Sequence, residues 1–159
     1  MTTEIELKYL VMDDNLAEVT AGKITELLID KDFTFVPDST QLTNHYFDTP
    51  SLDLRLHDMG LRVRRSVSEN KPLSIEQTIK TAGKVVGGLH QRPEYNVAIE
   101  HNFPALPLFP NHIWHDEQNI SAIQSQLQTI FTTDFTRMIW TVTVIDEQGQ
   151  NNIVELVLD

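Results

Sequence analysis

The chain has 159 residues, enough for one domain with a sizeable hydrophobic core. Its formal net charge is −11 and its pI is near 4.8, which argues against nucleic acid or an anionic membrane as a partner because both attract a basic surface. Cysteine is absent, which excludes disulfides, thiolate metal sites and thiol nucleophiles. No apolar run reaches transmembrane length, so we expect a soluble, cytoplasmic protein.

An alternating segment opens the chain. Read as a strand, it places Ile5, Leu7 and Tyr9 on one face and, on the other, Glu4, Glu6 and Lys8. Two carboxylates at this spacing suit a hard divalent cation such as Mg²⁺, which takes oxygen ligands and bridges to substrate phosphates. A neighbouring lysine can then contact the same phosphate. The alternative interpretation is an ordinary solvated face of an antiparallel strand.

A helix and a strand follow. Apolar residues recur at helical spacing up to about Ile29, and Asp13 or Asp14 is placed to cap the start of this helix. Residues 42–48 then have the composition of a strand, which Thr49-Pro50 closes.

The next segment predicts a hairpin with a basic polar face. Residues 61–64 alternate apolar and basic side chains, so Arg62 and Arg64 share one face. A turn around residues 69–72 leads into a second strand that ends at Lys80, whose side chain lies on the polar face.

Residues 90–99 predict a further strand, with Arg92 and Glu94 on its polar face. The proline at position 93 favours an edge or a bulge there. A second amphipathic helix is then indicated by a run of apolar residues at helical spacing: Ile120, Ile123, Leu127 and Ile130.

Two strands close the sequence. Residues 135–145 carry Arg137 on one face, with Met138 and Trp140 among the apolar residues of the other. Residues 153–159 form the last predicted strand and place Glu155 and Asp159 on one face.

About six or seven mostly sequential strands and two helices predict an α+β domain built on one antiparallel sheet. The polar strand faces are rich in basic residues although the chain is acidic. A sheet rolled with these faces inward gathers a set of cations in one cavity: Lys8, Arg62, Arg64, Lys80 and Arg137. Like charges confined together repel, so such a cavity is expected to hold a polyanion and a metal. The apolar faces then point outward, beneath the two helices.

Short motifs lie along the chain in a fixed order: Glu4-x-Glu6-x-Lys8, Tyr46-Phe47-Asp48-Thr49, Gly60-Leu61-Arg62-Val63-Arg64, Thr78-x-Lys80, Arg92-x-Glu94 and Thr133-Asp134-Phe135-x-Arg137. In this order they resemble the motifs of the CYTH family, also called triphosphate tunnel metalloenzymes. Residues 87–97 are especially similar to the bacterial inorganic triphosphatases that carry a CYTH domain at their N-terminus.

The resemblance implies one CYTH-like domain over residues 1–159, an antiparallel sheet rolled into a tunnel with the amphipathic helices packed outside. It implies that a triphosphate lies lengthwise in the tunnel, bound by Lys8, Arg62, Arg64, Lys80, Arg92 and Arg137. Glu94 is expected to line the tunnel. Glu4 and Glu6 are expected to hold Mg²⁺ or Mn²⁺, which orients or activates the attacking water. No side chain is assigned as the catalytic group.

The chain departs from the family pattern at its C-terminal end, because the family has later strands that carry further glutamates and a lysine. Glu155 and Asp159 are the candidates for the remaining metal ligands. We therefore expect residues 1–159 to be part of a longer polypeptide with an incomplete tunnel. Taken alone, the chain is expected to be weakly active or inactive, and its open sheet edge is suited to pairing in a homodimer.

Metal-dependent hydrolysis of inorganic triphosphate is the function that the sequence favours. The same scaffold also allows a class IV adenylate cyclase, a thiamine-triphosphatase or a non-catalytic module that binds polyphosphate or nucleotides. The expected partner is accordingly inorganic triphosphate or a nucleoside or thiamine triphosphate. No feature for recognising a base is apparent, which favours the inorganic substrate over ATP.

Overall fold

The computed structural model describes residues 2–7, 9–11, 17–86, 89–115 and 118–159, and within 2–6, 84–86 and 89–91 it describes the backbone. Lys8 and the predicted helix caps Asp13 and Asp14 lie outside the described residues. The helices are α1 (Ala17–Asp30), α2 (Asp53–Leu56) and α3 (Ile120–Gln126), with 3₁₀ turns η1 (Leu106–Leu108) and η2 (Asn111–Ile113). The strands are β1 (Thr2–Glu6), β2 (Thr34–Asp48), β3 (Gly60–Ser68), β4 (Ser74–Lys80), β5 (Lys84–Val86), β6 (Leu89–Ala98), β7 (Gln128–Ile145) and β8 (Asn151–Leu158).

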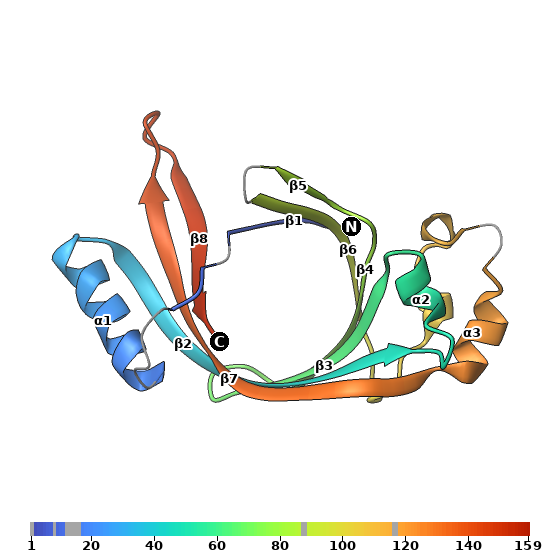
Figure 1. The fold of residues 1–159 in the computed structure, drawn as a ribbon. Helices are drawn as coiled ribbons and strands as arrows, with labels where there is room; N and C mark the ends of the chain where they lie inside the picture. The colour runs from blue at the N-terminus through green and yellow to red at the C-terminus, as the bar shows by residue number, and fades with distance from the viewer. Residues whose placement is uncertain (1, 8, 12–16, 87–88, 116–117) are drawn as a thin grey trace. The chain divides into compact units, whose positions relative to one another are not determined.

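Among the described residues the strands form one sheet in the order β1-β6-β4-β3-β2-β7-β8, and β5 pairs with β6 outside this path (Figure 1). The pairs β1–β6, β3–β4, β4–β6 and β7–β8 are antiparallel. The predicted α+β class with an antiparallel sheet is therefore confirmed. Within the described part of the chain, no helix is both long and apolar enough to cross a membrane.

The chain divides into two compact units, which we describe separately. The first unit comprises residues 1–10, 43–66 and 73–134, and the second comprises residues 11–42, 67–72 and 135–159. Three strands, β2, β3 and β7, contribute residues to both units.

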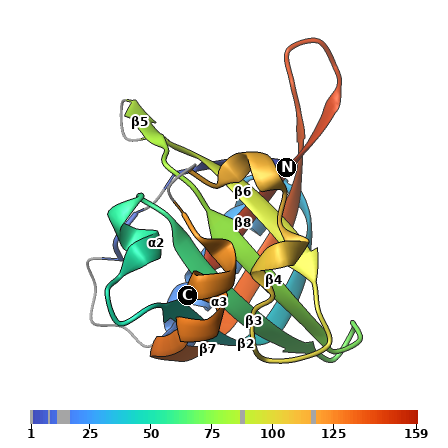
Figure 2. The same cartoon turned by 90° about the vertical axis from the view of Figure 1, so that its right-hand side faces the viewer.

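The core of the first unit lies on the apolar face of β3, β4 and β6. Leu61, Val63 and Ile79 are almost fully buried there, at alternate strand positions. Figure 2 shows α3 and the neighbouring 3₁₀ turns lying across β3 and β4. Gln77, buried on the same face, joins the sheet to this layer, because its side chain donates to the Ala105 carbonyl (3.0 Å) and accepts from the Ala105 amide (2.8 Å). A buried amide that satisfies both its donor and its acceptor in this way fixes the layer on the sheet.

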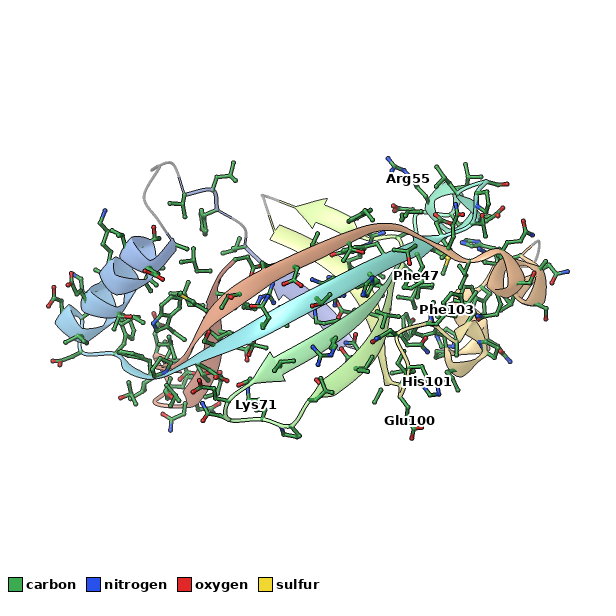
Figure 3. All side chains as sticks on the ribbon, turned by 90° about the horizontal axis from the view of Figure 1, so that it is seen from below. Phe47, Arg55, Lys71, Glu100, His101 and Phe103 are labelled. Atoms are coloured by element: carbon green, nitrogen blue, oxygen red, sulfur yellow. The ribbon has the colours of Figure 1, made fainter. Side chains whose placement is uncertain are left out.

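Asp48 has a structural role in the first unit. Its carboxylate is buried and accepts hydrogen bonds from the amides of Leu54 (3.0 Å) and Arg55 (3.1 Å). These are amides at the start of α2, which lack partners inside the helix. Phe47, the neighbouring residue, packs edge-on against Phe103 with ring centroids 5.4 Å apart (Figure 3). The motif at residues 46–49 thus anchors α2 and the loop after β6 to the sheet.

The core of the second unit lies between α1 and strands β2, β7 and β8. Leu28, Trp140 and Val142 are its buried residues. The Trp140 indole donates to Thr25 Oγ1 on α1 (3.0 Å), so the hydrogen-bonding group of the largest side chain in this core has a partner.

At the β3–β4 turn, where Figure 3 labels Lys71, this lysine forms a 3.0 Å ion pair with Asp38. The hydrogen bond from Lys71, with another from the Ser39 amide, lowers the pKa of Asp38 below its usual range.

Three predicted boundaries were wrong. The strand expected at 42–48 begins at Thr34, the second helix ends at Gln126 instead of continuing to Ile130, and the strand expected at 135–145 begins at Gln128. Leu127 adopts an extended backbone and Ile130 lies on β7. Ile120, Ile123 and Leu127 do fit a helical stripe, but the β-branched and aromatic run at 130–135 favours a strand, and β7 pairs from Gln128 onward.

The short helix α2 offers a matched test of the first core. Leu54 is fully buried there, whereas Leu56, two residues later, is 75% exposed. We expect Leu54→Ala to lower the free energy of unfolding by about 2–5 kcal/mol, and Leu56→Ala to change it by about 0.5 kcal/mol or less. Urea unfolding of both variants measures the difference. Equal losses would contradict the placement of Leu54 in the core.

Candidate functional site

The polar face of the first unit gathers four predicted site residues on neighbouring strands. In the β3–β4 register, Arg62 lies opposite Thr78 and Arg64 opposite Glu76. In the β4–β6 register, Thr78 lies opposite Asn96 and Lys80 opposite Glu94. Because alternate residues of a strand share a face, Arg62, Arg64, Lys80 and Glu94 lie on the side of the sheet opposite Leu61, Val63 and Ile79. The predicted hairpin faces are confirmed by this register.

Arg62 heads a short hydrogen-bonded row across three strands. Its Nη2 donates to Thr78 Oγ1 (3.3 Å), and Thr78 Oγ1 donates in turn to Asn96 Oδ1 (2.7 Å). Arg62 Nε is buried and has no hydrogen-bond acceptor among the described residues. A buried donor without an acceptor is costly, so this nitrogen is suited to an oxygen that a ligand brings.

Arg64 is oriented by a buried amide. Its Nε donates to Asn44 Oδ1 on β2 (2.7 Å), and Asn44 Nδ2 donates to Thr133 Oγ1 on β7 (3.0 Å). Asn44 is fully buried, whereas Arg64 is partly exposed. Asn44 thus orients the Arg64 guanidinium on the polar face, and a guanidinium carries several N–H donors in a planar fork that suits phosphate oxygens.

Lys80 and Glu94 form an ion pair with Nζ and Oε2 3.0 Å apart. Their side chains are 27% and 12% exposed, respectively, so this pair is partly removed from water. Glu94 therefore offsets part of the positive charge on this face. This contact gives the predicted tunnel-lining glutamate a defined neighbour.

Arg92, a predicted phosphate ligand, contacts the main chain. Its Nε donates to the Thr81 carbonyl (2.5 Å) and its Nη2 donates to the Asp58 carbonyl (2.6 Å). On the adjacent strand β1, the backbone register places Glu4 opposite Arg92 and Glu6 opposite His90.

Three further predicted residues, Arg137, Glu155 and Asp159, belong to the second unit, whereas Lys8 lies outside the described residues. Arg137 donates from Nε and Nη2 to the two carboxylate oxygens of Asp159, at 2.6 and 2.5 Å. Such a forked pair is the strongest geometry available to an arginine and a carboxylate. Glu155 is exposed on β8, where it lies opposite Thr141. The described geometry thus uses Asp159 as the partner of Arg137.

The acidic donors have the chemistry that a hard divalent cation requires. Glu4 and Glu6 occupy alternate positions of β1 and bring carboxylate oxygens, the ligands that Mg²⁺ and Mn²⁺ prefer. The described side chains contain no cluster of three or more His, Cys, Asp or Glu residues that could hold a metal by themselves. The carboxylates of Glu4 and Glu6 are therefore the type of ligand that suits Mg²⁺ or Mn²⁺.

The second unit contains a separate cavity of about 810 Å³ between α1, β2, β7 and the β3–β4 turn. Its described lining is largely apolar, with Trp140 and Met138 on one side and Asp38 and Glu69 among its polar groups. Neither lysine nor arginine occurs among these described lining residues. Its chemistry does not match a polyanion, so the basic face of the first unit is the candidate site.

Sequence reasoning missed the role of Asn44. This residue lies in the predicted strand at 42–48, and nothing local distinguishes it from a solvated asparagine. Its neighbours on β3 and β7 are 20 and 89 residues away in the chain.

A family model for the CYTH domain matches residues 2–159. The chain belongs to the CYTH family. It is 38% identical over 118 residues to the inorganic triphosphatase of Haemophilus influenzae, an alignment that covers 74% of this chain. The chain spans about 30% of the length of that relative.

A solved structure shares the fold of this CYTH chain at low sequence identity. The putative adenylyl cyclase HpAC1 from Hippeastrum, described as having a dominant triphosphatase activity, is 19% identical with a TM-score of 0.53. This match covers 85% of the present chain and 66% of that protein. The PH1819 protein of Pyrococcus horikoshii is 15% identical with a TM-score of 0.44, over 86% of this chain and 66% of its own.

The contact between Asn44 and Arg64 can be tested by substitution. We expect Asn44→Ala to lower the free energy of unfolding by about 1–3 kcal/mol, because it leaves a guanidinium N–H and the Thr133 hydroxyl without their partner. Thr43→Ala is the matched control on the same strand, since it removes an exposed hydrogen bond to Asp134. We expect this control to cost about 0.5 kcal/mol or less. Chemical denaturation compares the two variants, and a larger loss for the control would contradict the orienting role of Asn44.

Proposed function

We propose that this chain provides the triphosphate-binding site of an enzyme that hydrolyses inorganic triphosphate with the help of a divalent cation. The observation that carries the proposal is the set of basic side chains, Arg62, Arg64 and Lys80, on one face of the first unit in a chain whose net charge is −11. Membership of the CYTH family and the 38% identity to an inorganic triphosphatase support it.

The chemistry of the three cations suits a linear polyphosphate. Guanidinium groups bind phosphate oxygens in a fork, whereas a lysine ammonium acts as a compact point charge. Arg62 has a buried Nε that can donate to such an oxygen, and Thr78 holds the rest of the group in place. A polyanion also relieves the mutual repulsion of cations on one face. We assign Arg62, Arg64 and Lys80 to substrate binding, and the role of Lys8 and Arg137 in binding stays a prediction.

We assign Glu4 and Glu6 to the divalent cation, because they bring the oxygen donors of β1. A bound Mg²⁺ or Mn²⁺ supplies charge neutralisation at the phosphates and orientation of the attacking water. The contribution of Glu155 and Asp159 to the same ion stays a prediction. So does the cytoplasmic location that the composition indicates.

The strand β3 contains its own control for the binding site. Arg62 lies on the polar face. Arg65, three residues later, is exposed and lies on the opposite face of the strand. We expect Arg62→Ala to weaken tripolyphosphate binding by about 1.5–3 kcal/mol, roughly tenfold to a hundredfold, because it removes a hydrogen bond to a charged group. Arg65→Ala changes only the net charge and is expected to have little effect. Isothermal titration of both variants provides the measurement.

Equal affinities of the two arginine variants would overturn the assignment of the polar face.

The substrate class is tested separately, by following phosphate release from tripolyphosphate, ATP and thiamine triphosphate side by side with Mg²⁺ or Mn²⁺. We expect tripolyphosphate to be the preferred substrate. Conversion of ATP to a cyclic nucleotide would instead identify an adenylate cyclase. Binding without turnover would fit a non-catalytic module or the incomplete tunnel that the sequence predicts for residues 1–159.

The metal assignment predicts a different response. We expect Glu4→Gln and Glu6→Gln to weaken Mn²⁺ binding at least about tenfold, because each removes a charged oxygen ligand. Removing one of two like charges relieves repulsion in the metal-free protein, so the stability of these variants should be unchanged or higher. Glu100→Gln, on the exposed surface of the same unit, is the control (Figure 3). Loss of stability with unchanged Mn²⁺ affinity would make these two glutamates structural.

A further inference from the structure

Arg92 differs from the other basic residues of the first unit because its guanidinium is directed at backbone carbonyls. The two carbonyls belong to Thr81, the residue after β4, and to Asp58, in the turn between α2 and β3. Since Arg92 itself lies on β6, one side chain connects three separate segments. The Thr81 amide also donates to the Pro93 carbonyl (3.1 Å), so the end of β4 is attached to β6 at two points.

The Asp58 turn is the strained part of this arrangement. Asp58 has a φ of +53°, in the left-handed region that residues other than glycine rarely adopt. The turn leads directly into β3, and the first residue of β3, Gly60, lies opposite Lys80. The conformation of the Asp58 turn therefore determines the position of Gly60, which lies two residues before Arg62 on β3.

The hydrogen bonds to the carbonyls, more than the ion pair with the Asp58 carboxylate, join Arg92 to the Asp58 turn. The Asp58 carboxylate is 3.5 Å from Arg92 Nη2, and the two side chains are 72% and 36% exposed, respectively. An ion pair that is this long and this exposed contributes little. Hydrogen bonds from a charged donor to carbonyl groups are stronger, and the planar fork of arginine presents two N–H groups in fixed directions to the two carbonyls.

We propose that Arg92 is a positioning residue, which fixes the Thr81 and Asp58 main chain so that Lys80 and Arg62 stand correctly on the polar face. The effect on triphosphate rests on the proposed function, whereas the effect on the Asp58 turn does not. Arg92 acts through the backbone that carries the cations. Its substitution is therefore expected to alter stability and binding together.

The test combines Arg92→Ala with Asp58→Gly. Glycine adopts a positive φ without strain and keeps the carbonyl group, so Asp58→Gly pre-forms the turn that Arg92 otherwise holds. We expect Arg92→Ala to lower the urea midpoint of the 159-residue chain and to weaken tripolyphosphate binding about tenfold. Adding Asp58→Gly should recover about threefold of this affinity and part of the midpoint. A contact between Arg92 and phosphate cannot be restored by a change at Asp58.

Two further variants keep the test decisive. Arg92→Lys retains the charge but reaches only one carbonyl, so its midpoint should fall between those of the unsubstituted chain and Arg92→Ala. Asp58→Asn removes the carboxylate but tolerates the left-handed backbone, and should change affinity by less than about twofold. If Arg92→Ala proves unable to fold, the comparison of Arg92→Lys with Asp58→Asn still measures the effect of the hydrogen bonds from Arg92 to the Thr81 and Asp58 carbonyls.

Each result decides the question. Weaker binding by Arg92→Ala with an unchanged midpoint and no recovery from Asp58→Gly would overturn the positioning role in favour of a direct phosphate contact. Arg92→Lys that matches the unsubstituted chain in both measurements would overturn it as well. Absence of tripolyphosphate binding by the unsubstituted chain would overturn the proposed function alone. In that case, faster amide hydrogen exchange at residues 58–62 in Arg92→Ala supports the positioning role of Arg92, and unchanged exchange overturns it.

Discussion

Electrostatic repulsion between basic side chains on one sheet face is the constraint on which the first unit depends. Residues two apart on a strand are about 7 Å from each other, and neighbouring strands are closer still. Arg62, Arg64 and Lys80 therefore occupy a small area of one face. Such an arrangement persists only if the opposite face supplies enough stability and the cations are individually held. The first unit meets both requirements.

The holding contacts differ from one cation to the next, and the differences indicate what each is free to do. Lys80 has an acidic neighbour, Glu94, which offsets its charge in the absence of ligand. Arg64 has a neutral neighbour, Asn44, which directs the group without offsetting its charge. Arg62 contacts a hydroxyl and retains a buried Nε that lacks an acceptor among the described residues. Since a hydroxyl leaves a guanidinium fully charged, Arg62 is well suited to bind an anion.

Period-two alternation explains how much could be predicted from the sequence. Once residues 61–64 and 73–80 are recognised as strands, the alternation places Arg62, Arg64 and Lys80 on one face and Leu61, Val63 and Ile79 on the other, whatever the tertiary context. The antiparallel register of the hairpin follows from its short turn. The end of α3 could not be predicted in this way, because the 120–130 segment satisfies helical and strand preferences at once and strand β7 begins at Gln128.

Contacts between distant segments account for what the sequence could not reveal. The resemblance to the CYTH family implied a phosphate contact for Arg92, and the structure adds contacts of its guanidinium with carbonyls 11 and 34 residues away. Asn44 looked like an ordinary strand residue, although it joins β2 to β3 and β7. In both cases the residue type and its spacing are unremarkable. The role is created by the ends of other strands, which no local pattern encodes.

The two faces of the sheet consequently contribute to stability in opposite ways. Leu54, Leu61 and Ile79 lie on the side that stabilises the unit, and their burial leaves little room for change. Arg62 and Arg64 lie on the side where charge repulsion lowers stability and ligand binding restores it. Substitutions that reduce charge on the polar face can therefore stabilise the free protein while weakening its affinity for an anion. Closely spaced cations that cost stability in the free protein are therefore the property expected of a surface that binds an anion, because the bound anion offsets their repulsion.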